Sequence, residues 1–458
     1  MKDDEIICSS CLSQFEEILR KETCGRIKVK ATQNIKSAQQ QVLVLSLARD
    51  NTNYLIEYNE VSDLGYRLMD ACERSSGRLV LRIWKGGARW WNLNSNSKDA
   101  CLQLANAEVA GYRVAREAFH LYHTKVGRGH FQDFPRISIP EVLLFKKGGG
   151  YANPWAIFSY VKDMNIISEG ASSHDWKFCD DFIHSMVKIR KEFGFDEPHP
   201  RHGRVCVEHA LEYAEHVLEN AIIPLHTIFF DRESNDDSFN YIIRQEIHVL
   251  NANNFRCSGG AISYHDMVQL YQENIYQIKK KHKFDRQSKT EKICVFITAI
   301  EGFIDKLVLE AKSVEDFPLP SVVCHLDLQP QNMILCTSKN VPSSIPRITS
   351  ILDWEESCYA DPRFELLLLC RKVVANRKQA DTLWGYYSKY LSDQFHLKVG
   401  PIDPWLRLES VHSLLGMCMQ GMDLLEGGRN PWEEKSDLLN KMQCEIYRLQ
   451  RGLNWGAG

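Results

Sequence analysis

Residues 322–335 read Val-Val-Cys-His-Leu-Asp-Leu-Gln-Pro-Gln-Asn-Met-Ile-Leu: a short apolar run, a polar turn and a second apolar run. After a polar gap, residues 348–355 add Ile-Thr-Ser-Ile-Leu-Asp-Trp-Glu. Short apolar runs bounded by polar residues predict strands. We therefore expect two strands that flank a turn, followed by a third strand that brings in a further carboxylate, Asp353.

Phosphoryl transfer from Mg-ATP needs the groups that this stretch supplies. One carboxylate orients the acceptor hydroxyl and takes its proton, while a carboxamide oxygen and a second carboxylate hold Mg²⁺, which prefers oxygen ligands. Asp327 fits the first role, and Asn332 and Asp353 fit the second. We group His325 with Asp327 in the catalytic loop and expect it to brace the loop rather than to perform chemistry.

The spacing of these residues supports the same interpretation. Asn332 follows Asp327 by five residues, and Asp353 comes one hairpin later, as in the catalytic loop of kinases. The alternative is that Asp and Asn stand here as ordinary turn residues. That alternative explains each residue singly but not the agreement of residue type, spacing and flanking strands.

The pattern His325-x-Asp327-x-x-x-x-Asn332, followed by Ile-Leu-Asp-Trp-Glu at 351–355, resembles the aminoglycoside phosphotransferase and choline kinase superfamily. Protein kinases usually carry Asp-Phe-Gly at the second site, whereas small-molecule kinases resemble this chain. The resemblance covers the C-terminal half well and the N-terminal third more weakly. It implies an α+β, two-lobed protein-kinase-like fold with a β-rich N-terminal lobe, a mainly helical C-terminal lobe, and ATP and Mg²⁺ as cofactors.

Residues 78–84, Arg-Leu-Val-Leu-Arg-Ile-Trp, predict a strand and resemble the choline and ethanolamine kinase strand that ends in Leu-Arg-aliphatic-aromatic. The resemblance places Arg82 where the fold needs a cation for the ATP phosphates, and an arginine fork can grip phosphate bidentately. Glu108, in a helical pattern over 104–121, fits the carboxylate that pairs with this cation. The alternatives are an arginine on an edge strand and a glutamate on a solvated helix face.

Two further segments are expected to contact the nucleotide. Residues 41–47 and 54–58 predict strands, and the superfamily places its phosphate-covering loop, usually glycine-rich, between such strands. Here the turn has no glycine; the backbone N–H groups of Asn51 and Asn53 can face phosphate, but an ordinary hairpin turn explains them at least as well. Residues 155–161 predict the strand that enters the hinge, where we expect backbone atoms near Phe158 and Tyr160 to hold adenine.

We divide the chain into a helical N-terminal extension at 1–40, an N-terminal kinase-like lobe at 41–162 and a C-terminal helical lobe at 163–458. In the last of these, helical spacing predicts helices at 207–220, 264–281 and 291–312.

Residues 360–366, Ala-Asp-Pro-Arg-Phe-Glu-Leu, resemble the superfamily's Gly-Asp-Pro-x-x-Asp-Leu segment, which caps a helix and braces the metal loop. Asp361 before Pro362 is a helix-start signal on local grounds alone. Glu365 stands where the family more often has Asp, and we give it no catalytic role.

Composition excludes several classes of partner. A net charge of −3 over 458 residues leaves no global basic field for nucleic acid or for an anionic membrane, and it is compatible with a cationic substrate. We find no signal-peptide core and no apolar run long enough to span a membrane. The fifteen cysteines are scattered, which predicts reduced thiols and a cytoplasmic protein; the pair Cys8 and Cys11 lacks a second pair at zinc-finger spacing.

Three functions compete. The first is an aminoglycoside-phosphotransferase-like kinase that transfers the γ-phosphate of ATP to a hydroxyl of a small molecule, and this is the one we adopt. The second is a choline or ethanolamine kinase, favoured by the Arg82 strand but opposed by the Asp-Trp-Glu and Asp-Pro segments. The third is a nucleotide-binding pseudokinase that acts by interaction; the glycine-poor turn motivates it, and the intact Asp327, Asn332 and Asp353 oppose it.

The acceptor does not follow from the sequence. Aromatic side chains can cage a quaternary ammonium, and Trp432 lies close in sequence to several acidic residues: Asp423, Glu426, Glu433 and Glu434. An aromatic residue in the core beside solvated surface acids is the simpler explanation. The sequence does not specify the oligomeric state either.

Overall fold

The computed structural model describes most of the 458-residue chain, with gaps. The described residues are 3–36, 40–49, 61–85, 98–125, 137–148, 153–161, 210–230, 237–250, 261–281, 291–328, 332–336, 347–372, 376–425, 442–444, 446, 447 and 449. The chain forms two compact units: unit 1 holds residues 1–175, 235–253 and 331–357, and unit 2 holds 176–234, 254–330 and 358–458. A five-stranded sheet lies in unit 1 and unit 2 is mainly helical, so the predicted α+β class with two lobes is confirmed.

The sheet of unit 1 is antiparallel throughout, with the strand order β1-β2-β3-β5-β4. Its strands are β1 (Ile27–Lys36), β2 (Gln40–Arg49), β3 (Arg78–Trp84), β4 (Val142–Lys146) and β5 (Trp155–Ser159). Side chains alternate between the two faces of a strand. In β3, Leu79, Leu81 and Ile83 therefore share one face and join the hydrophobic core, while Arg82 and Trp84 share the other.

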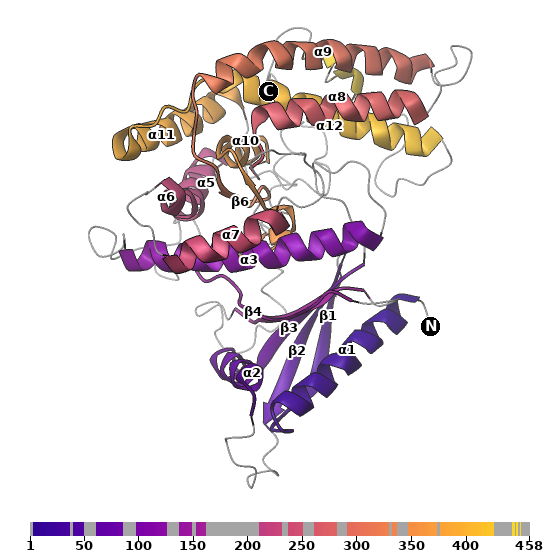
Figure 1. Ribbon diagram of the computed structural model, residues 1–458, viewed down its shortest axis with the longest axis vertical. Helices are drawn as coiled ribbons and strands as arrows, with labels where there is room; N and C mark the ends of the chain where they lie inside the picture. The colour runs from indigo at the N-terminus through magenta and orange to yellow at the C-terminus, as the bar shows by residue number, and fades with distance from the viewer. Residues whose placement is uncertain are drawn as a thin grey trace, which may run out of the picture. The chain divides into compact units, whose positions relative to one another are not determined.

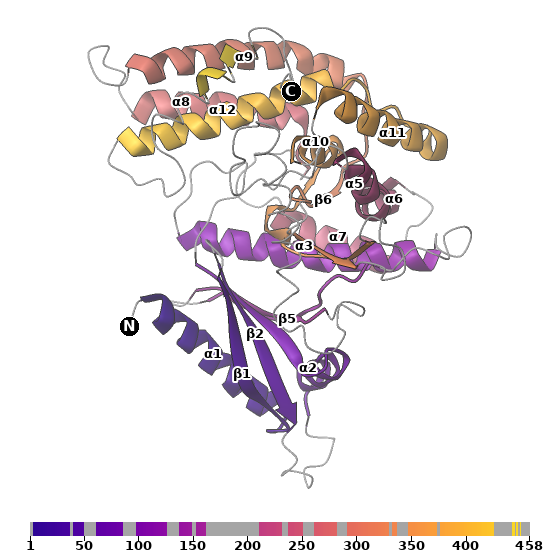
Figure 2. The ribbon, with the colours of Figure 1, turned by 180° about the vertical axis from the view of Figure 1, so that it is seen from behind.

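One face of the sheet is covered by α1 (Asp3–Glu22) and α2 (Asp63–Arg74) (Figures 1 and 2). The core between them is made of aliphatic and aromatic side chains, among them Phe15, Leu45, Leu68, Leu81 and Ile157, each fully buried. The helix α2 begins at an N-cap, Ser62, whose side-chain oxygen accepts a hydrogen bond from the backbone N–H of Gly65. These contacts hold the face of β3 that carries Leu79, Leu81 and Ile83. The opposite face, which carries Arg82, is left for the candidate site.

The N-terminal segment differs in part from the sequence prediction. The expected helix is present as α1, but residues 27–36, which we grouped with a helical extension, form the edge strand β1. The helix ends because Cys24 and Gly25 both adopt a positive φ, and the N–H of Gly25 bonds back to the carbonyl of Arg20. The strand then pairs with β2 although it is exposed from Lys30 to Gln33.

Beyond the sheet, unit 1 contains α3 (Lys98–Lys125), which packs along α7 (Asp237–Leu250) (Figures 1 and 2). It also contains the hairpin of β7 (Met333–Cys336) and β8 (Arg347–Ile351), followed by a 3₁₀ turn at Trp354–Glu356. The helix α3 approaches this turn closely at Gly111: a Cβ there would lie 2.3 Å from Ser357 Oγ and 2.9 Å from Trp354 Cβ. Only glycine permits this approach without a shift.

Unit 2 contains a small two-stranded sheet, β6 (Val322–Cys324) paired with β9 (Cys358–Ala360). Its helices are α5 (Ala210–Val217), which continues through a π-turn at Leu218–Ile222 into α6 (Ile223–Phe230), α8 (Tyr264–Lys281), α9 (Glu291–Glu315), α10 (Arg363–Lys372), α11 (Arg377–Phe395) and α12 (Asp403–Leu425). Three of them, α8, α9 and α12, lie side by side (Figure 1). The helix predicted at 264–281 coincides with α8, and the one at 291–312 ends three residues later, at Glu315.

Several predictions fall outside the described residues: the strand at 54–58, the turn with Asn51 and Asn53, and the surroundings of Trp432. Within the described part of the chain, no helix is long and apolar enough to cross a membrane.

Candidate active site

The polar face of β3 carries a buried arginine that is held by carboxylates. The side chain of Arg82 places Nη1 2.5 Å from Oε1 of Glu108 and Nη2 2.5 Å from Oδ1 of Asp353, and a second Nη2 contact reaches Oε2 of Glu355 at 3.5 Å. The residue as a whole is only 9% exposed. The structure therefore brings together three residues that the sequence assigned to phosphate and metal binding: Arg82, Glu108 and Asp353.

Two aromatic side chains that the sequence analysis missed complete this arrangement. Trp84, on the same face of β3, donates from Nε1 to Oε2 of Glu108 at 2.7 Å. Tyr112, one helical turn after Glu108, accepts a hydrogen bond from the backbone N–H of Asp353 at 2.9 Å. The signals were the strand spacing from Arg82 to Trp84 and the helix spacing from Glu108 to Tyr112. Trp84 thus fixes the carboxylate of Glu108, and Tyr112 fixes the backbone of Asp353; neither adds a charge to the cluster.

The β7–β8 hairpin positions the two expected metal ligands of unit 1. Met333 pairs with Ile351, and one residue further the N–H of Leu352 bonds to the carbonyl of Asn332 at 2.8 Å. Asn332 and Asp353 consequently leave the hairpin at the same end. Asp353 adopts a left-handed backbone conformation (φ 64°), and its side chain remains 32% exposed. A non-glycine residue in this conformation is uncommon, and such residues cluster at functional sites.

The electrostatics of this cluster favour a further cation. Carboxylate oxygens of Glu108, Asp353 and Glu355 lie within 4.8 Å of one another around the single guanidinium of Arg82. Burial raises the pKa of Glu108 to about 8, although Arg82 opposes the shift. Burial, and next the charge of Asp353, raises the pKa of Glu355 well above its usual range. Burial alone would lower the pKa of Arg82, but Glu108 and Asp353 outweigh it and raise that pKa.

These residues fit Mg²⁺. The donors at this end of the hairpin are the oxygens of Asp353, Glu355 and Asn332, with neither sulfur nor imidazole among them, and such oxygen donors are the ligands that Mg²⁺ prefers. Three ionised carboxyl groups facing one guanidinium would carry an excess of negative charge in a largely buried place, and the raised pKa values of Glu108 and Glu355 reflect that cost. A bound dication would offset that excess.

In unit 2, the turn that carries Asp327 is fixed through its backbone. The buried carboxylate of Glu365 accepts hydrogen bonds from the backbone N–H of Leu326, at 3.0 Å, and from that of His325. The Nδ1 atom of His325 accepts from the N–H of Asp327 at 3.1 Å. Leu326 between them has φ 65°, so the turn needs such support. Asp327 itself is partly exposed and can reach a solvent-borne substrate.

The sequence analysis gave Glu365 no catalytic role and did not foresee these bonds. The missing signal was tertiary: α10 must pack on β6 before its first turn can meet the backbone of residues 325–326. The helix start was foreseen, and Asp361 precedes α10 and pairs with Arg363 at 2.6 Å.

The remaining sequence-predicted residues are placed as follows. Phe158 is buried in β5, and its ring centroid lies 4.9 Å from that of Tyr112. Tyr160 follows β5, and its hydroxyl accepts from Nη1 of Arg78 at 3.3 Å. Their role in holding adenine stays a prediction, because it concerns backbone atoms. Asn51 and Asn53 lie outside the described residues.

Comparison with known proteins finds a family model that matches part of the chain. Residues 281–396 match the family model described as the phosphotransferase enzyme family. The matched segment contains His325, Asp327, Asn332 and Asp353, whereas Arg82 and Glu108 precede it. The match confirms the resemblance found in the sequence, and with it the expected enzyme class, a small-molecule phosphotransferase. No curated protein matches this sequence.

Solved structures give similarities along nearly the whole chain. A macrolide 2'-phosphotransferase from Brachybacterium faecium is 10% identical, covering 95% of this chain and 97% of its own, with a TM-score of 0.43. An ethanolamine kinase from Plasmodium vivax is 10% identical, covering 96% and 88%, with a TM-score of 0.45. A choline kinase from Cryptosporidium parvum is 13% identical, covering 96% and 97%, with a TM-score of 0.37.

Proposed function

We propose that this protein transfers the γ-phosphate of ATP, in the presence of Mg²⁺, to a hydroxyl group of a small molecule. The observation that carries the proposal is the buried network in which Arg82 joins Glu108 to Asp353. A guanidinium held in place by carboxylates is suited to grip phosphate, and the adjoining oxygen donors are suited to hold the metal.

The residues of unit 1 bind and orient the nucleotide. Arg82 pairs with phosphate oxygens, and Glu108, itself fixed by Trp84, sets the direction of the guanidinium. Asn332 and Asp353 supply oxygens to Mg²⁺, with Glu355 as a third donor. When bound, Mg²⁺ neutralises charge on the phosphate oxygens of the transferring group. The backbone near Phe158 and Tyr160, and the turn with Asn51 and Asn53, are the proposed adenine and phosphate contacts.

The residues of unit 2 act on the acceptor. Asp327 accepts a hydrogen bond from the acceptor hydroxyl, orients its oxygen and takes its proton as the phosphoryl group transfers. Glu365 and His325 hold the backbone on either side of Leu326, so that the carboxylate of Asp327 keeps one direction. Because positioning supplies much of the rate in phosphoryl transfer, we expect these braces to affect turnover more than nucleotide affinity.

The acceptor class is tested by ADP release from Mg-ATP across a panel of hydroxylated compounds. The panel holds aminoglycosides, macrolides, choline, ethanolamine, sugars and hydroxylated amino acids. A hit that Asp327→Asn abolishes and that Asp305→Asn, an exposed change on α9, leaves intact supports the proposal. Turnover that survives in Asp327→Asn contradicts the role of Asp327.

The same panel separates the alternatives. Choline or ethanolamine as the only acceptor would favour a choline or ethanolamine kinase, which the Arg82 strand resembles. Nucleotide binding without turnover of any acceptor, and without slow hydrolysis of ATP to ADP, would favour a pseudokinase.

A further inference from the structure

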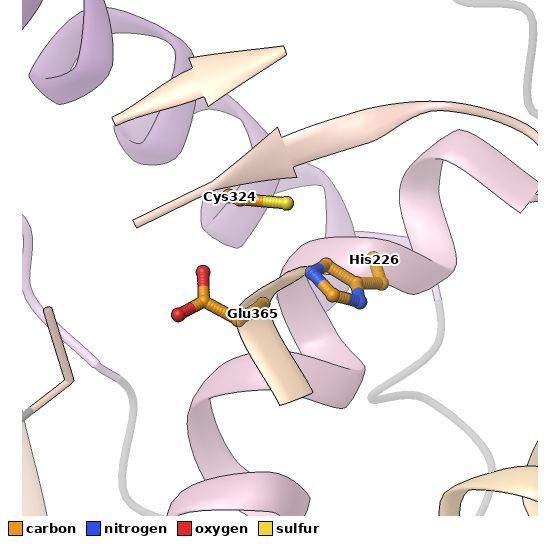
Figure 3. Close-up of side chains that lie close together, drawn as sticks. All are labelled: His226, Cys324 and Glu365. Atoms are coloured by element: carbon orange, nitrogen blue, oxygen red, sulfur yellow. The ribbon is translucent and has the colours of Figure 1, made fainter. Parts of the chain in front are cut away.

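A second cluster of potential metal ligands lies inside unit 2. His226 from α6, Cys324 from β6 and Glu365 from α10 place one ligand atom each within 4.8 Å of the others. Figure 3 shows the three side chains close together on these separate elements, with one ring nitrogen of His226 facing the other two residues and the carboxylate of Glu365 directed away from the imidazole. All three are fully buried, with exposed fractions of 1%, 0% and 1%. The cluster combines sulfur, nitrogen and oxygen donors, unlike the carboxylate cluster of unit 1.

The imidazole of His226 is oriented as in a metal ligand. Its Nδ1 lies 2.8 Å from the hydroxyl of Tyr387, while its Nε2 is buried and has no hydrogen-bond partner among the described residues. Metal-binding histidines almost always engage the second ring nitrogen in this way, because the bond fixes the tautomer and the ring direction. A buried nitrogen without a partner otherwise carries a desolvation penalty. A metal on Nε2 would remove that penalty.

The carboxylate of Glu365 is likewise fixed by hydrogen bonds. The backbone N–H groups of His325 and Leu326 donate to it. Ligating carboxylates are themselves commonly hydrogen-bonded. Cys324 belongs to β6 and stands opposite Cys358 of β9 in the ladder, so a second thiol adjoins the cluster.

We propose that His226, Cys324 and Glu365 form a structural Zn²⁺ site, with Cys358 as the donor nearest to a fourth position. Zn²⁺ is bound by thiolate, imidazole and carboxylate in tetrahedral sites, whereas Mg²⁺ and Ca²⁺ avoid sulfur. Binding converts the Cys324 thiol to a thiolate and releases its proton to solvent. Each further cysteine that binds, Cys358 included, releases one more.

The site would act on the turn that precedes Asp327. Glu365 is shared between the cluster and the backbone N–H groups of residues 325 and 326, so a metal on Glu365 would hold the strand end more firmly. The effect is structural and separate from the Mg²⁺ proposed for unit 1. It does not depend on which acceptor the enzyme uses.

The test is a titration of the purified full-length protein, stripped with a chelator, with zinc chloride alone against a chromophoric competitor. Cys324→Ala and His226→Gln are compared with Cys370→Ala, which removes an equally buried cysteine from α10 outside the cluster. The Cys370→Ala protein should bind one more equivalent of zinc than either site variant. Zinc at about 100 times its Kd should raise the Tm of wild type and of Cys370→Ala by about 3–5 °C.

Cobalt gives a second readout, and its first part needs only the wild-type protein. Wild-type protein loaded with Co²⁺ should show a thiolate-to-cobalt charge-transfer band, and that band should weaken in Cys324→Ala but not in Cys370→Ala. The proposal is overturned if wild type binds no zinc and gives no such band. It is equally overturned if Cys324→Ala, folded by circular dichroism, binds as much zinc as Cys370→Ala.

Discussion

Replacing Arg82 by methionine would test the electrostatic design of the candidate active site. The change keeps an aliphatic stem on β3 but removes the cation that faces Glu108, Asp353 and Glu355. Breaking a buried ion pair by removing one partner costs about 3–5 kcal/mol, because the remaining charge stays buried without its partner. We expect Arg82→Met to lose about this much unfolding free energy at pH 9.5, where Glu108 is ionised in wild type.

The loss should shrink as the pH falls. Burial already raises the pKa of Glu108 to about 8 against the pull of Arg82, so removing Arg82 raises it further. A carboxyl group whose folded-state pKa exceeds its unfolded value binds more protons in the folded state. The variant is therefore most stable below the unfolded pKa and loses stability as the pH rises toward the folded one. Each unit of pKa difference corresponds to about 1.4 kcal/mol.

The assay is urea denaturation at pH 7 and pH 9.5, with a chelator present, followed by tryptophan fluorescence, to which Trp84 and Trp354 of unit 1 contribute. Because Glu108 ionises in wild type only above its pKa of about 8, the deficit of Arg82→Met relative to wild type should be larger at pH 9.5 than at pH 7, by up to about 2 kcal/mol. The control is Arg116→Met on α3, whose partner Glu141 is mostly shielded but whose own side chain is 48% exposed. It should cost less than about 1 kcal/mol at both pH values. An equal deficit for Arg82→Met at pH 7 and pH 9.5 would refute the reasoning.

Three further perturbations test other parts of the structure. Gly111→Ala should destabilise the protein by about 2–3 kcal/mol in thermal unfolding, because the added Cβ would overlap Ser357 Oγ. The control is Gly385→Ala on α11, which has open space around it and should be neutral or stabilising. Glu365→Gln should lower turnover with less effect on the Kd for ATP, because Glu365 supports the turn before Asp327 and lies outside the unit 1 residues proposed to bind the nucleotide; an unchanged kcat would contradict this. Burial would raise the pKa of Glu141, but Arg116 and two further arginines outweigh it and lower that pKa. The ionised Glu141 therefore stabilises the folded protein above pH 4.5, and this stabilisation is lost as the pH falls further. Glu141→Gln should make the Tm fall less steeply in acid than it does in wild type, and an unchanged slope would contradict the assignment.

The sequence predicted those elements whose signal is local. The helix at 264–281 was found with its ends because its apolar residues recur at helical spacing, and β3, β6, β7 and β8 were found as short apolar runs. By contrast, β1 is a polar edge strand, exposed over much of its length, and β9 is three residues long and exists through its pairing with β6. Neither carries a pattern strong enough to be read without the partner strand.

Some contacts of the candidate site could likewise be predicted from the sequence, and others depend on tertiary packing. The pairing of Arg82 with Glu108 was foreseen through the family resemblance, which fixes the roles of residues far apart in sequence. The contact of Arg82 with Asp353 was not foreseen, because the sequence assigned Asp353 to Mg²⁺ alone. The supporting contacts of Trp84, Tyr112 and Glu365 were not, because each depends on how a helix packs on a strand. The His226 cluster was invisible for the same reason: its members are 98 and 41 residues apart in the chain (226 to 324, and 324 to 365).

The most direct test of the proposed function is the Mg²⁺ dependence of ATP binding, measured by the change in Tm and by calorimetry in wild type and in Asp353→Asn. We predict that ATP stabilises the wild-type protein strongly only when Mg²⁺ is present, and that Asp353→Asn loses most of this Mg²⁺-dependent gain while keeping its fold. ATP binding that is indifferent to Mg²⁺, or an Mg²⁺-dependent gain that Asp353→Asn retains in full, would contradict the assignment of Asp353 and of the network around Arg82.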